Sequence, residues 1–236
     1  MKGKRLLFGV VTALGLVACA ASGPGAAQLQ KAEALLESAP DSCVALLDGI
    51  SPETLRGRRL KAGYALLYAR ASDAAFGFIP SEEADMLEAA AEFFEQKGPR
   101  EDRLATWYLL GKVQYADGAL YRAVVSFEKA LSAARQLQDD AAQGEICRQL
   151  AYTYNASLQH VAAARQLYAA WRAFEKAGKA DESRRTLLEY GQAWYNFERY
   201  DEAGEIFQAV LTQAHAAADT LTEVRCLQSY AAMLLE

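Results

Sequence analysis

The stretch WYLLGKVQYADGALYRAVVSFEKA, residues 107 to 130, contains two apolar patterns with helical spacing. Gly111 is followed after twelve positions by Ala123, and Phe127 and Ala130 come four and seven positions later. The same order of small and large residues recurs at intervals of 40 residues. The matching residues are Leu150, Ala151, Ala163, Leu167 and Ala170, then Tyr190, Gly191, Ala203, Phe207 and Val210, with Tyr230 and Ala231 beginning a further copy. Such a period predicts stacked helix pairs.

This order resembles the tetratricopeptide repeat (TPR), and Trp107 stands where that repeat places its tryptophan, three residues before Leu110. The resemblance implies two antiparallel helices, A and B, in each unit. The usual period is about 34 residues, so a period of 40 predicts that each helix is longer by roughly a turn. We therefore expect an all-α protein of about eleven helices, arranged as a right-handed superhelix of antiparallel pairs, a TPR-like α-solenoid.

The repeat also predicts how the helices pack. Small residues such as Gly111 in helix A and Ala123 in helix B are expected where the two helices cross closely, with Phe127 filling the gap to the next hairpin. A degenerate earlier unit is expected from Ala89 and Phe93, which stand 34 residues before Ala123 and Phe127. The expected early helices cover about 27–38, a segment capped by Asp41, 53–74 and 81–97.

The first residues have the pattern of a secretory signal, with Lys2, Lys4 and Arg5 before an apolar run. That run, 6–18, would be about 20 Å long as a helix, too short to cross a bilayer of roughly 30 Å. The following Leu-Val-Ala-Cys resembles the lipobox of Gram-negative lipoproteins, which implies cleavage before Cys19 and lipid attachment to its thiol. The alternative is an ordinary signal peptide with a chance cysteine.

The chain is thus expected to comprise four segments. They are a lipoprotein signal peptide at 1–18, a lipidated tether at 19–28, N-terminal helices with a degenerate first repeat at 29–100, and TPR-like repeats at 101–236, the last incomplete. In the final segment Leu227, Tyr230, Ala231 and Leu234 are expected on the inner face of a last helix over 221–235. Its apolar ending AAMLL suggests further repeats beyond Glu236, a covering subunit, or a frayed cap.

The residues offer no constellation for catalysis, so the chain is not expected to be an enzyme. The two histidines, His160 and His215, stand 55 positions apart, and no nucleophile, metal or phosphate motif occurs. Cys43, Cys147 and Cys226 have no metal-ligand spacing and are expected to behave as small hydrophobes, and the acidic doublets at 82–83 and 139–140 as helix caps. A net charge of −5 argues against nucleic acid. No cofactor, metal or catalytic residue is predicted.

The resemblance implies binding instead, through positions five, nine and twelve of each helix A, which line the concave groove. These positions are Tyr108, Lys112, Tyr115, Arg148, Tyr152, Asn155, Leu188, Gln192 and Tyr195. Tyrosines beside cations and amides suit an extended peptide or a partner helix. The alternative is that several of these tyrosines only pack between units.

Together these features favour a membrane-anchored periplasmic scaffold that binds envelope proteins or peptides. Ala20 stands where some Gram-negative lipoproteins carry the aspartate that retains them at the inner membrane, which favours the outer membrane. Two alternatives remain: the extracytoplasmic sensor part of a longer signalling protein, and an enzyme or solute-binding lipoprotein.

We predict that Cys19→Ala abolishes both acylation and cleavage behind Ala18, because the thiol accepts the lipid before the signal is removed. Metabolic labelling with palmitate, together with the mass of the purified chain, measures both steps. Labelling that persists in the variant would refute this assignment.

Overall fold

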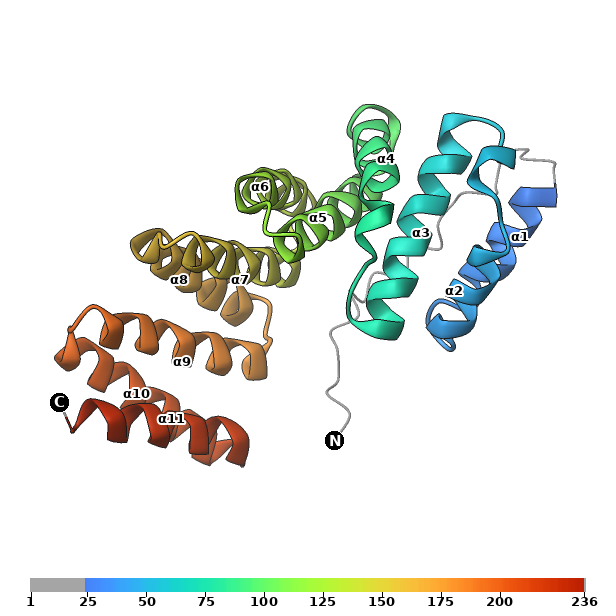
Figure 1. Cartoon of the computed structure of the whole chain (residues 1–236). Helices are drawn as coiled ribbons and strands as arrows, with labels where there is room; N and C mark the ends of the chain where they lie inside the picture. The colour runs from blue at the N-terminus through green and yellow to red at the C-terminus, as the bar shows by residue number, and fades with distance from the viewer. Residues whose placement is uncertain (1–23, 236) are drawn as a thin grey trace. The chain divides into compact units, whose positions relative to one another are not determined.

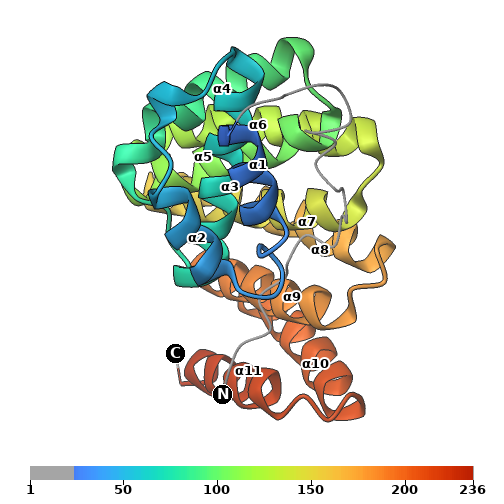
Figure 2. The ribbon, with the colours of Figure 1, turned by 90° about the vertical axis from the view of Figure 1, so that its right-hand side faces the viewer.

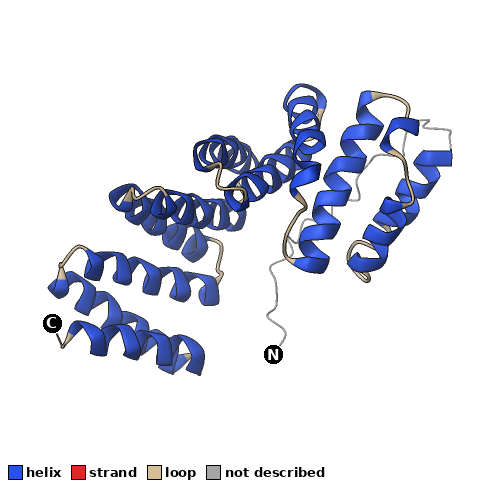
Figure 3. Ribbon diagram, viewed as in Figure 1, coloured by secondary structure: helices blue, strands red, loops and turns tan. Residues whose placement is uncertain are grey.

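The computed structural model describes residues 24–235, in which all regular secondary structure is helical (Figures 1 and 3). Eleven α-helices and two short 3₁₀ turns lie in this part of the chain, and consecutive helices pack as antiparallel pairs. This confirms the expected all-α, TPR-like repeat fold. The chain divides into two compact units, Met1–Leu137 and Gln138–Glu236, each described by itself.

The first unit contains six helices. They are α1 (Pro24–Glu33), α2 (Pro40–Asp48), α3 (Arg58–Phe76), α4 (Ala84–Lys97), α5 (Arg100–Ala116) and α6 (Leu120–Leu137), with 3₁₀ turns at Pro52–Thr54 and Ser81–Glu83. Each helix packs against the next one in the sequence. The early helices differ from expectation at their ends: α1 stops at Glu33, and Asp41 lies in the first turn of α2, whose N-cap is Ala39.

The second unit contains α7 (Asp140–Ala156), α8 (His160–Lys176), α9 (Ala180–Asn196), α10 (Tyr200–Ala216) and α11 (Thr220–Met233). In Figures 1 and 2, α9, α10 and α11 follow one another as neighbours, and the contacts between these helices agree. The helices from α7 to α10 are each 17 residues long. Two such helices with their three-residue turns give the period of 40, as the predicted extra turn requires.

The turns of this unit repeat one backbone feature. A residue with positive φ stands every 20 positions, at Leu158 (60°), Gly178 (68°), Glu198 (60°) and Ala218 (53°). A left-handed residue ends a helix by turning the chain away from the helical path, at a cost for residues with a Cβ. Since three of these four positions are not glycine, the helices on either side hold the turn in this conformation.

The helix hairpins are held by aromatic rings lying directly on glycine. A Cβ atom added at Gly111 would lie 2.6 Å from Phe127 Cε1, and one at Gly191 would lie 2.8 Å from Phe207 Cε1. Both rings are fully buried. Phe127 therefore contacts helix A of its own hairpin. That it also fills the gap to the next hairpin stays a prediction. Glycine in helix A leaves room for the ring at this crossing.

The face of α11 that is buried also differs from expectation. Thr222 and Cys226 are buried and Tyr230 is half-buried against Phe207, whereas Leu227, Ala231 and Leu234 are exposed. The expectation was wrong for these last three residues. In earlier units the positions equivalent to Leu227, which are Trp107, Cys147 and Leu187, are at most 5% exposed. Helix B of the same pair packs on that face, and no helix within residues 24–235 follows α11 to do so.

The signal peptide and Cys19 lie outside the described residues. The structure begins with α1 at Pro24, so residues 24–28 of the expected tether are helical. Among the described residues, no helix has the combined length and apolar character that a membrane crossing needs.

We predict that Phe127→Ala lowers the free energy of unfolding of the first unit by about 3–5 kcal/mol, because it leaves a cavity beside Gly111. Phe78→Ala is the matched control, since Phe78 is 60% exposed and its loss costs within about 0.5 kcal/mol. Urea denaturation monitored by circular dichroism measures both. Equal effects of the two variants would show that the Gly111–Phe127 contact does not stabilise the hairpin.

Candidate functional site

Three predicted groove residues lie on α5 in the first unit. Tyr108 is only 7% exposed, and its ring centroid lies 6.1 Å from that of Phe127. Lys112 forms a salt bridge with Asp73 of α3, and Tyr115 is 36% exposed. Tyr108 thus has the packing role that the sequence left open, whereas Tyr115 presents its ring at the surface.

In the second unit, Arg148 and Tyr152 of α7 connect to Glu189 of α9. The Arg148 Nε donates to the Tyr152 hydroxyl at 3.3 Å, and that hydroxyl lies 3.0 and 3.1 Å from the two Glu189 carboxylate oxygens. Burial, together with the Glu189 charge, raises the pKa of Tyr152 to about 12, so the phenol stays protonated and its hydroxyl donates a hydrogen bond to the carboxylate. The contact ties two successive A helices together through one hydroxyl group.

Burial also raises the pKa of Glu189, although the positive charge of Arg148 opposes this shift. Arg148 is shared with a second carboxylate, because its Nη1 lies 3.9 Å from Glu145 Oε2. One guanidinium group therefore stands between two carboxylates, Glu145 and Glu189. Arg185 is a second positive charge that opposes the rise in the pKa of Glu189.

Next to this network is a cavity of about 250 Å³, which we call the α7–α9 cavity. Its lining residues are Tyr152, Asn155, His160, Leu167, Glu189, Gln192, Ala193, Asn196 and Phe197. Three of them, Tyr152, Asn155 and Gln192, are predicted groove residues, so the fold brings these three together from two A helices. Asn155 Oδ1 lies 3.2 Å from His160 Nδ1, and Gln192 donates to Ser229 Oγ at 2.9 Å.

The other two candidates on α9 lie outside this cavity. Leu188 is 4% exposed and belongs to the core with Phe207. Tyr195 is half-buried, and its ring centroid lies 5.9 Å from that of Tyr200 at the start of α10.

Sequence reasoning missed Glu189, His160, Asn196 and the apolar wall formed by Leu167 and Phe197. Glu189 follows position five of its unit by one residue, and therefore falls outside the positions that the repeat pattern assigns to the groove. His160 is the first residue of α8, a B helix, from which no groove residue was expected. Only the spacing of 37 residues between Tyr152 and Glu189, close to one period, hinted that these two side chains meet.

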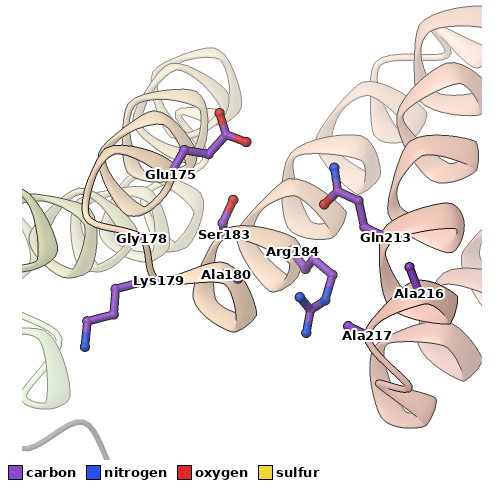
Figure 4. A pocket seen from close by; sticks show the side chains of 9 residues that line it. All are labelled: Glu175, Gly178, Lys179, Ala180, Ser183, Arg184, Gln213, Ala216 and Ala217. Carbon is purple, nitrogen blue, oxygen red and sulfur yellow. The ribbon is translucent and has the colours of Figure 1, made fainter.

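A second hollow of about 480 Å³ lies at the other end of α9 (Figure 4). Its lining side chains come from the end of α8, the following turn, the start of α9 and the end of α10. Arg184, which is 6% exposed, binds Asp181 at 2.6 Å and Asp219 at 3.1 Å. Although burial opposes ionisation of Asp219, hydrogen bonds from Thr222 and Arg184 lower its pKa. The guanidinium is thus neutralised within the fold, and it links α9 to the start of α11.

Within residues 24–235, no group of three or more histidine, cysteine, aspartate or glutamate side chains is placed to hold a metal ion. Cys43, Cys147 and Cys226 are buried and no disulfide joins any two of them, which agrees with their expected role as small hydrophobes.

No protein-family model matches the sequence, and no curated protein matches it either. Solved structures are similar in fold. The chain resembles nearly identical TPR-like repeats assigned to a kinesin light chain of Podosopora anserina, with a TM-score of 0.63 at 20% sequence identity. This match covers 82% of this chain and 95% of that one. It also resembles aspartyl phosphate phosphatase F of Bacillus subtilis, with a TM-score of 0.67, 14% identity, and coverage of 89% and 55%.

A third similar structure is a signal transduction ATPase with numerous domains from Pyrococcus horikoshii, which has a TPR sensor. The TM-score is 0.68 at 14% identity, and the match covers 89% of this chain but 32% of that one. At these identities the likeness establishes the TPR-like repeat fold.

We predict that Tyr152→Phe lowers the free energy of unfolding by about 1–3 kcal/mol at pH 7, because Glu189 loses its hydrogen-bond donor. The loss of this donor raises the pKa of Glu189 further above its value in the unfolded chain. A carboxyl group whose pKa is raised by folding loses stability as the pH rises through that pKa, so the difference from wild type is smaller at about pH 5.

Urea denaturation at both pH values measures this difference. Tyr168→Phe is the matched control in the same unit, because the side chain of Tyr168 is 47% exposed. A loss in Tyr152→Phe that matches the control, or that grows as the pH falls, would contradict the assignment.

Proposed function

We propose that the second unit binds a protein or peptide segment along α7 and α9, and that the chain acts as a non-catalytic scaffold. The observation that supports this most directly is the α7–α9 cavity, where Tyr152, Asn155 and Gln192 come together. Amide and hydroxyl groups of this kind can pair with the backbone of an extended segment, and the tyrosine ring adds apolar contact area.

We further propose that the scaffold is held on a membrane by a lipid on Cys19, on the outer membrane and facing the periplasm. The basic start, the short apolar run, the lipobox-like Leu-Val-Ala-Cys and Ala20 support this location. Two or more acyl chains would anchor the chain stably without a spanning helix. The partner is then a protein or peptide of the cell envelope.

The second candidate is the extracytoplasmic sensor part of a longer signalling protein. The similarity to the Pyrococcus horikoshii structure favours it, because that protein carries a TPR sensor and this chain matches 32% of its length. The reading frame downstream of Glu236 distinguishes the two candidates. A transmembrane segment and a signalling domain there would favour the sensor.

We predict that a photo-reactive amino acid at position 155 cross-links a protein partner in the native cell, and that one at position 168 does not. Both side chains are exposed, but Asn155 lies at the α7–α9 cavity, whereas Tyr168 lies on the B helix α8. The adducts are separated by gel electrophoresis and identified by mass spectrometry. Adducts of equal yield at both positions, or none at position 155, would count against binding along α7 and α9.

A further inference from the structure

The α7–α9 cavity combines apolar walls with a single carboxylate. Leu167, Ala193 and Phe197 supply the apolar part of the lining, and Glu189 is its one acidic residue. Among the nine described residues that line it there is no lysine or arginine. At about 250 Å³ the cavity is smaller than the roughly 300–1,000 Å³ of pockets for drug-sized ligands, and it suits one long side chain.

Two polar residues of the cavity, Glu189 and Gln192, offer acceptor oxygens to a ligand that donates hydrogen bonds. The Glu189 carboxylate can only accept when ionised. Because the amide nitrogen of Gln192 donates to Ser229, its amide oxygen remains as an acceptor. A negatively charged ligand would face Glu189 directly, and an apolar one would bury these polar groups without partners.

The charged groups around Glu189 also favour a cation in the cavity. Arg148 lies near both Glu145 and Glu189, and Arg185 is a second cation that acts on Glu189. Burial raises the pKa of Glu189 although both of these positive charges oppose the shift. A cation placed in the cavity would favour the ionised form of this buried carboxylate.

We propose that the α7–α9 cavity binds a lysine or arginine side chain of the bound segment, with the cationic head on Glu189 and the aliphatic stem against Leu167, Ala193 and Phe197. Long basic side chains combine an apolar stem with a charged donor, which matches both parts of this lining. This inference rests on the proposed function, because it assigns the kind of residue that the groove selects.

The test uses the full chain labelled with ¹⁵N, titrated with N-acetyl-lysine methylamide while the amide shifts of Ala193 and Phe197 are followed by NMR. The neutral comparison is the same molecule with a hydroxyl group in place of the ammonium. N-acetyl-arginine methylamide is the second cationic probe. We expect both cationic probes to bind about tenfold or more tightly than the alcohol, as a charge-assisted hydrogen bond requires.

Two variants distinguish binding in the cavity from non-specific electrostatic attraction to the protein surface. Glu189→Gln retains an oxygen that can accept from Tyr152 but removes the charge, and we expect it to weaken binding of the cationic probes about tenfold or more. Glu205→Gln, at an exposed position of α10, is the matched control and should leave binding within about twofold. Thermal melts of both variants check folding, and the comparison of probes on the wild type does not depend on the variants.

Equal affinity for the cationic and neutral probes, or no shift at Ala193 and Phe197, would overturn the inference. So would Glu189→Gln binding the lysine probe as tightly as wild type does. If cross-links at position 155 persist in either case, the groove binds a partner without selecting a basic residue, and the proposed function stands. If those cross-links are absent, the proposed function fails whatever the probes do.

Discussion

Direct contact between an aromatic ring and glycine is the constraint on which the helix hairpins depend. Phe127 on Gly111 and Phe207 on Gly191 let two A and B helices approach more closely than any residue with a Cβ would allow. Where the second copy has Ala151 instead of glycine, it has the smaller Leu167 instead of phenylalanine, and both lie in one core cluster. The summed volume of the two residues is therefore similar in these copies although both residues differ, as close packing requires.

In the α7–α8 hairpin a different pair, Gly144 and Phe174, makes the contact between a ring and glycine. A Cβ atom at Gly144 would lie 2.7 Å from Phe174 Cδ1, and the Phe174 ring is almost fully buried. The crossing with a ring on glycine has therefore moved toward the start of α7 and the end of α8. At the other end of the hairpin, Asn155 and His160 line the α7–α9 cavity.

The negative charge of the α7–α9 cavity comes from Glu189, and the nearby cation Arg148 also lies close to Glu145. The Tyr152 hydroxyl connects Arg148 to Glu189, and the same guanidinium lies near Glu145. At the other end of α9, Arg184 likewise lies between two carboxylates, Asp181 and Asp219. The two ends of this helix differ in the charged side chain that lines the hollow, which is Arg184 at one end and Glu189 at the other.

The fold class, the period and the lengths of the helices could be predicted from the sequence, because small and large residues at fixed spacing can bury their faces only by stacking hairpins. It also placed Tyr152, Asn155 and Gln192 on A helices, which the structure brings to one cavity. The structure was needed to show that Tyr108 is buried, that Leu227 is exposed, and that Glu189 contacts Tyr152. These outcomes depend on which neighbouring helix covers a face, and no periodicity within one helix encodes that.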